Sequence, residues 1–89
     1  MNSYFIILGG SLDQLYLIKN IHELKYKCIV FDKNRNCPAK KVADIFFPID
    51  FSQYQKVIKK LIECKKKKNI NLKGIITMGC DVPLLIVKI

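Results

Sequence analysis

The stretch that decides the fold is YFIILGGS, residues 4–11, near the start of the 89-residue chain. Its unbroken apolar run predicts a strand that is buried on both faces, as central strands of parallel sheets are. Gly9 and Gly10 end the strand in a tight turn. Over residues 12–25 the apolar side chains change to helical spacing, with Gln14 on the same stripe. This order of strand, glycine turn and amphipathic helix is typical of an α/β unit.

Three later segments repeat the strand pattern. Residues 28–31 (CIVF) and 74–78 (GIITM) predict buried strands, and residues 45–49 (IFFPI) predict a third. Pro48 has no N–H to donate to a neighbouring strand, so this third strand is expected at an edge of the sheet. Residues 39–44 predict a short helical turn before it.

A second amphipathic helix is predicted from the apolar spacing of residues 54–62. Its start is open between Asp50 and Ser52. Ser52 and Gln55 have the spacing of a capping box, in which each side chain bonds to the other's backbone N–H. The lysines at 65–68 lie where a helix carboxyl end favours positive charge.

These elements predict an α/β fold: a Rossmann-like three-layer sandwich with a four-stranded parallel sheet in the order 3-2-1-4. Residues 1–89 are expected to form one domain, because the chain is too short for two. A third helix is predicted from Asp81, with Pro83 in its first turn. It is expected to be truncated at Ile89, so we expect the domain to be a fragment of a longer enzyme.

In this order the first and fourth strands lie side by side, and a crevice is expected at their carboxyl ends. The crevice would be lined by Gly9, Gly10 and Ser11. These residues could present bare backbone and a helix N-terminus to an anion, or they could form only a tight turn. Asp32, 22 residues after Gly10, could bind a ribose hydroxyl or anchor its own loop. The G-x-G-x-x-G dinucleotide pattern is absent, which disfavours a nicotinamide cofactor. Asp13 is interpreted as a complement to the helix dipole.

The cysteines indicate neither a metal site nor a nucleophile. No two of them form a C-x-x-C pair, and His22 is the only histidine that could complete a zinc site, so we expect no bound metal. Cys80 is near a helix start, but His22 is expected away from the crevice with no carboxylate to orient it, so we expect no catalytic residue. Free thiols and the absence of a signal or of a membrane-length apolar run indicate a cytoplasmic protein.

Charge is the feature that first suggests nucleic acid. The 16 basic residues exceed the seven acidic ones and give a net charge of +9. Only Arg35 is an arginine, however, and the guanidinium group is the one that recognises phosphates and base edges in bidentate fashion. We therefore expect no nucleic-acid partner, although a basic adaptor with salt-sensitive duplex binding stays an alternative.

Three segments in this order resemble a known family. They are ILGGS at residues 7–11, the pattern D-x-N-x-x-x-P-A-x-x-x-A-D at 32–44, and I-I-T-M-G-x-D at 75–81. Together they are similar to the N-terminal, pre-ATP-grasp domain of ATP-grasp ligases, the group that holds carbamoyl-phosphate synthase, biotin carboxylase and the purine-pathway ligases. The resemblance spans essentially the whole chain.

The resemblance implies an ATP-dependent carboxylate–amine ligase that works through an acyl phosphate. ATP and magnesium would be bound by later lobes of the same chain, and this segment alone would hold no cofactor and be inactive. It would line one wall of the pocket for the small-molecule acceptor substrate. The resemblance leaves a homodimer open for the full-length enzyme, with no membrane partner. The substrate-binding residues that it implies are Gly9, Gly10, Ser11, Asp32, Asn34, Gly79, Cys80 and Asp81.

Two departures restrict this assignment. Ser11, Leu12 and Asp13 occupy the first turn, where family members that act on ribonucleotide amines often have a further glycine and a carboxylate. Cys80 stands where serine is expected.

The alternative class is a stand-alone flavodoxin-like or receiver-like module that binds a nucleotide or a partner, although such modules need about five strands.

Overall fold

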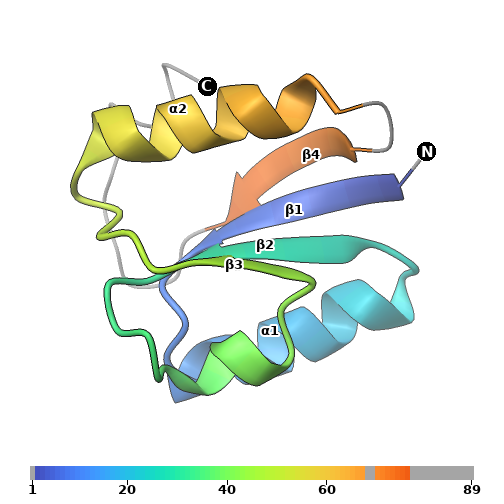
Figure 1. Ribbon diagram of the computed structural model, residues 1–89. Coiled ribbons are helices and arrows are strands. Elements are labelled where there is room, and N and C mark those ends of the chain that lie inside the picture. Colours follow the sequence, from blue (N-terminus) through green and yellow to red (C-terminus); the bar gives the residue numbers. More distant parts are fainter. Residues whose placement is uncertain (1, 68–69, 77–89) are drawn as a thin grey trace.

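The computed structural model describes residues 2–67 and 70–76. Four parallel strands form one sheet in the order β3-β2-β1-β4, which confirms the predicted order (Figure 1). Helix α1 and the short 3-10 helix η1 cover one face and helix α2 covers the other, so the fold is the expected three-layer α/β sandwich of Rossmann-like type. The elements are β1 (Asn2–Leu8), α1 (Leu12–Glu23), β2 (Lys27–Phe31), η1 (Pro38–Lys41), β3 (Ile45–Phe47), α2 (Tyr54–Lys65) and β4 (Ile70–Ile76).

Strand β1 lies between two neighbours, which explains its unbroken apolar run. Ile6 pairs with Ile29 of β2 on one side and with Ile75 of β4 on the other. Its side chain packs with the cluster beneath α2, whereas the next residue, Ile7, packs with the cluster beneath α1. Both isoleucines are fully buried. A strand covered by helices on both faces has no polar positions to alternate with.

Strand β3 lies at one edge of the sheet, as Pro48 predicts. It is shorter than the expected strand over residues 45–49, because it ends at Phe47, immediately before Pro48. Among the described residues it pairs only with β2. Strand β4 begins at Ile70, four residues earlier than the apolar pattern indicates, and it is described as far as Ile76.

The predicted third helix lies outside the described residues. Among the helices that the structure describes, none has the length and apolar character needed to cross a membrane.

The predicted capping box is wrong. Helix α2 begins at Tyr54 with Gln53 as its N-cap residue, and no side chain makes a capping hydrogen bond there. Instead, Asp50 Oδ1 accepts hydrogen bonds from the Ser52 backbone N–H at 3.0 Å and from the Ser52 hydroxyl at 2.9 Å. The serine hydroxyl is thereby used in a turn two residues before the helix, and the helix starts later than either expected position.

Candidate functional site

The turn after β1 depends on the conformation of Gly9. This residue has φ +101°, in the region that residues with a side chain rarely adopt. Its backbone N–H donates a 2.8 Å hydrogen bond to the Phe31 carbonyl oxygen at the end of β2. The predicted tight turn with positive φ is confirmed, and the turn is held to the neighbouring strand.

Gly10 is buried under the loop that follows β2. A Cβ atom on Gly10 would lie 2.7 Å from Cys37 Sγ and 3.1 Å from Ala39 Cβ, so a side chain does not fit there. The backbone N–H of Gly10 donates to Asp32 Oδ2 at 2.8 Å, and its carbonyl accepts from the Ala39 N–H at 3.0 Å. The N–H groups of both glycines are thus bound within the protein, so neither is free to bind the anion of a ligand.

Asp32 anchors its own loop, which is one of the two roles considered for it. While Oδ2 holds Gly10, Oδ1 accepts a 2.9 Å hydrogen bond from the Asn34 N–H. The Asn34 side-chain oxygen in turn accepts from the Asn36 N–H at 3.0 Å. Two successive Asx turns therefore shape the loop. Each carboxylate oxygen keeps a second lone pair, so a ligand hydroxyl or amine could still bind Asp32.

A hollow of about 490 Å³ lies between the first turn of α1 and this loop. It brings together three of the expected site residues, which are Ser11, Asp32 and Asn34. Its full lining is Ser11, Leu12, Asp13, Asp32, Asn34, Cys37 and Pro38. Gly9 and Gly10 shape the hollow from behind but are not part of its lining. The other three expected residues, Gly79, Cys80 and Asp81, lie outside the described residues.

The polar groups of the hollow favour a ligand that donates hydrogen bonds. Asp13 and Asp32 contribute two carboxylates, and Asn34 and Ser11 add an amide and a hydroxyl group. Ser11 makes no capping hydrogen bond, so its hydroxyl is not used by the helix. Asp13 in the first turn of α1 already provides the negative charge that the helix dipole favours. An amine or a hydroxyl group therefore suits the hollow better than a bare phosphate.

Leu12 was not predicted as a lining residue, whereas Cys37 and Pro38 belong to the loop 32–38 that was expected at the rim of the crevice. Leu12 is 70% exposed although it begins the amphipathic helix, and this exposure reflects its place over the hollow rather than over the sheet. Cys37 and Pro38 are brought there by the hydrogen bond from Ala39 to Gly10. That contact joins residues 29 positions apart, and no local sequence pattern reports it.

Gln14 has the buried position that the helical stripe predicts. Its side chain is 3% exposed, and Oε1 has no hydrogen-bond partner within the part of the chain that the structure describes. Its amide nitrogen lies 3.9 Å from the position that a Cβ on Gly9 would take. The Gln14 amide therefore lies beside the glycine turn, and its carbonyl oxygen is unpaired among the described residues.

The expectation that no carboxylate orients His22 is wrong. His22 Nε2 lies 2.8 Å from Asp44 Oδ2, and the same oxygen accepts a 2.7 Å hydrogen bond from the Cys28 backbone N–H. His22 is in the last turn of α1 and Asp44 immediately precedes β3. Asp44 is also the last residue of the D-x-N-x-x-x-P-A-x-x-x-A-D pattern, but only the tertiary fold brings it to the histidine.

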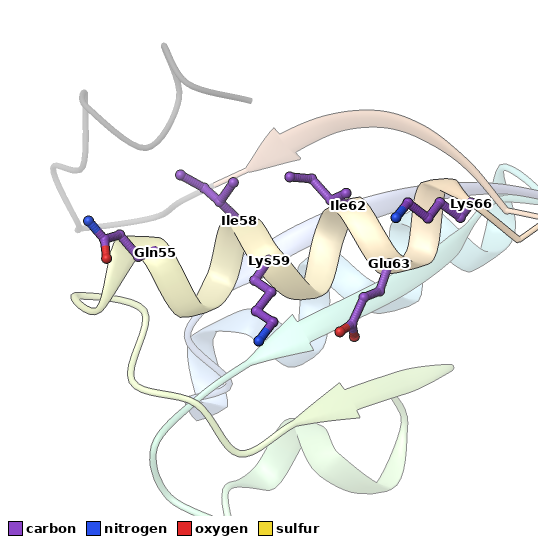
Figure 2. A pocket seen from close by; sticks show the side chains of 6 residues that line it. All are labelled: Gln55, Ile58, Lys59, Ile62, Glu63 and Lys66. Carbon is purple, nitrogen blue, oxygen red and sulfur yellow. The ribbon is translucent and has the colours of Figure 1, made fainter.

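A second hollow, of about 400 Å³, lies along α2 and contains none of the expected site residues. Figure 2 shows that Ile58 and Ile62 point to one side of the helix, whereas Lys59 and Glu63 point to another. This separation of the apolar pair from the charged side chains is typical of an amphipathic surface helix.

Comparison with known proteins adds no relative. No protein-family model matches the chain, and no curated protein and no solved structure is similar to it at a significant level.

Proposed function

We propose that this chain is the N-terminal substrate-wall domain of an ATP-dependent carboxylate–amine ligase of the ATP-grasp type. The observation that carries the proposal is the hollow at the carboxyl edge of the sheet. There the turn after β1 and the loop after β2, both expected to line the acceptor pocket, meet around Ser11, Asp32 and Asn34. In this role the domain binds the acceptor substrate, and other lobes of the enzyme supply ATP and magnesium.

The chemistry of the hollow supports an amine acceptor. An ammonium or amine group can donate hydrogen bonds to Asp13 and Asp32, whose carboxylates accept several each. The Asx turns fix Asp32 before a ligand arrives, which lowers the entropy lost on binding. The amine must be neutral when it attacks the acyl phosphate. The two carboxylates are suited to holding the amine in position before this attack.

The proposal is tested by following the amide resonances of the ¹⁵N-labelled chain by NMR. Glycine and ethanolamine serve as primary-amine probes, and magnesium ATP serves as the nucleotide probe. We expect the amines to shift the resonances of Ser11, Asp13 and Asn34, and we expect no tight binding of ATP. Asp13→Asn should weaken the amine response, because Asp13 is an exposed carboxylate of the lining.

Glu23→Gln is the matched control, since it removes an exposed carboxylate of the same helix from outside the hollow. It should leave the amine response unchanged. Low-micromolar affinity of the isolated chain for magnesium ATP would contradict the proposal. So would the absence of any amine-dependent shift around the hollow.

A further inference from the structure

Three potential metal ligands meet at the end of α1 opposite to the candidate substrate hollow. His22 comes from the last turn of α1, Cys28 from the start of β2, and Asp44 from the residue before β3. One nitrogen, one sulfur and one carboxylate oxygen from these side chains lie within 4.8 Å of one another. Gly10 and Ser11 stand at the other end of the same helix, so this cluster is separate from the hollow.

We propose that His22, Cys28 and Asp44 form a binding site for a zinc-class divalent metal ion. Imidazole, thiolate and carboxylate are all ligands that zinc accepts, whereas magnesium and calcium prefer oxygen alone. Three protein ligands leave the fourth tetrahedral position for a water molecule.

The distances are close to those that a bound ion requires. Metal–ligand bonds of 2.0 to 2.3 Å at tetrahedral angles place donor atoms about 3.4 Å apart. The observed spread of up to 4.8 Å therefore needs a contraction of up to about 1.4 Å, which would come from side-chain rotations. The Cys28 N–H already holds the Asp44 carboxylate at 2.7 Å, and this hydrogen bond would orient the ligand from outside the coordination shell.

The ligand types suit the charge of a divalent cation. A thiol that coordinates a metal ion gives up its proton, so Cys28 would bind as the thiolate. A thiolate and a carboxylate together neutralise a divalent ion.

The cluster is accessible from solvent. The His22 and Asp44 side chains are 36% and 27% exposed. A hollow of about 540 Å³ borders His22 between α1 and Val42 and contains both Lys19 and Glu23, whose charges offset each other. This hollow gives solvent access to the His22 side chain, whereas Cys28 is buried.

Cobalt(II) and zinc are the probes that test this site, added to the full 89-residue chain under reducing conditions. We expect one equivalent of cobalt to produce a thiolate-to-cobalt charge-transfer band in the near ultraviolet. Cys28→Ser should abolish the band, and His22→Gln should weaken binding about tenfold or more. Cys64→Ala should keep the band, because Cys64 packs with the other cluster beneath α2.

A wild-type chain without the band, or a band that survives in Cys28→Ser, would overturn the proposal. If Cys28→Ser does not fold, X-ray absorption of the wild-type zinc complex decides the question. One sulfur at about 2.3 Å beside nitrogen and oxygen ligands supports the site, and a shell without sulfur overturns it. Neither result depends on ATP or amine binding, so this proposal and the proposed function fail separately.

Discussion

Gly10 shows most directly how one residue positions the candidate site. Its missing side chain lets Cys37 and Ala39 approach the backbone, and that approach closes the loop of Asp32 over the first turn of α1. Position 10 requires glycine because there is no space for a side chain, and not because of an unusual φ. Position 9 requires glycine because its φ is positive.

We therefore expect Gly10→Ala to lower the free energy of unfolding by about 1 to 3 kcal/mol, as overpacked core substitutions do. Cys37 Sγ, only 2.7 Å from the new Cβ, would have to move. Gly74→Ala is the control, because within the described part of the chain its Cβ would meet only the Phe5 ring, at 3.6 Å. Urea unfolding measures both variants, and equal effects would contradict this account of Gly10.

A second residue-scale prediction concerns the unpaired carbonyl of Gln14. Replacing a buried, unsatisfied polar group by an apolar one of similar shape is neutral or stabilising. Gln14→Met should leave the free energy of unfolding unchanged or raise it by up to about 1 kcal/mol. Gln55→Met, at an exposed position of α2, should change it by less than about 0.5 kcal/mol. A clear loss in Gln14→Met would mean that the amide has a partner that stabilises the fold.

We expect the free energy of unfolding to depend on pH in the alkaline range because of Cys64. Burial raises the pKa of this thiol above its ordinary value of 9.0. A raised folded-state pKa means that the contribution of Cys64 to stability is complete below pH 9 and is lost as the pH rises through the folded value. The stability advantage of the wild type over Cys64→Ala should therefore shrink above pH 9 in urea unfolding series. An advantage that stays constant up to pH 11 would contradict this.

At the scale of elements, the start of α2 depends on the turn before it. Hydrogen bonds from the Ser52 N–H and hydroxyl hold the pKa of the Asp50 carboxyl below its ordinary value of 3.8. The stabilisation is present above pH 3.8 and is lost as the pH falls through the lower folded value. Carboxyl ¹³C titration by NMR should place the Asp50 midpoint below 3.8. Ser52→Ala should move the midpoint upward, whereas Gln55→Ala, which removes the other member of the rejected capping box, should not.

Over the whole molecule, apolar runs were sufficient to predict the fold. The continuous runs in β1 and β2 indicate that these two strands are central, and the proline after β3 indicates that β3 lies at an edge. Element boundaries were predicted less well, because Asp50 competes for Ser52 and displaces the start of α2.

The contacts that make the sites could not be read from spacing alone. Asp32 meets Gly10 and Asp44 meets His22, in each case across 22 residues and at opposite ends of α1. Both contacts arise because β2 returns parallel to β1, which places the segment after β2 beside α1. The residue types were visible in the sequence, but their partners depend on this crossover.

The most direct test of the proposed ligase is to sequence the transcript that encodes the chain and to read its open reading frame. We predict that the frame continues beyond Ile89 into two further lobes with a glycine-rich, lysine-bearing phosphate loop and paired acidic residues for magnesium. A stop codon directly after Ile89, with no adjacent frame that supplies these elements, would contradict the account.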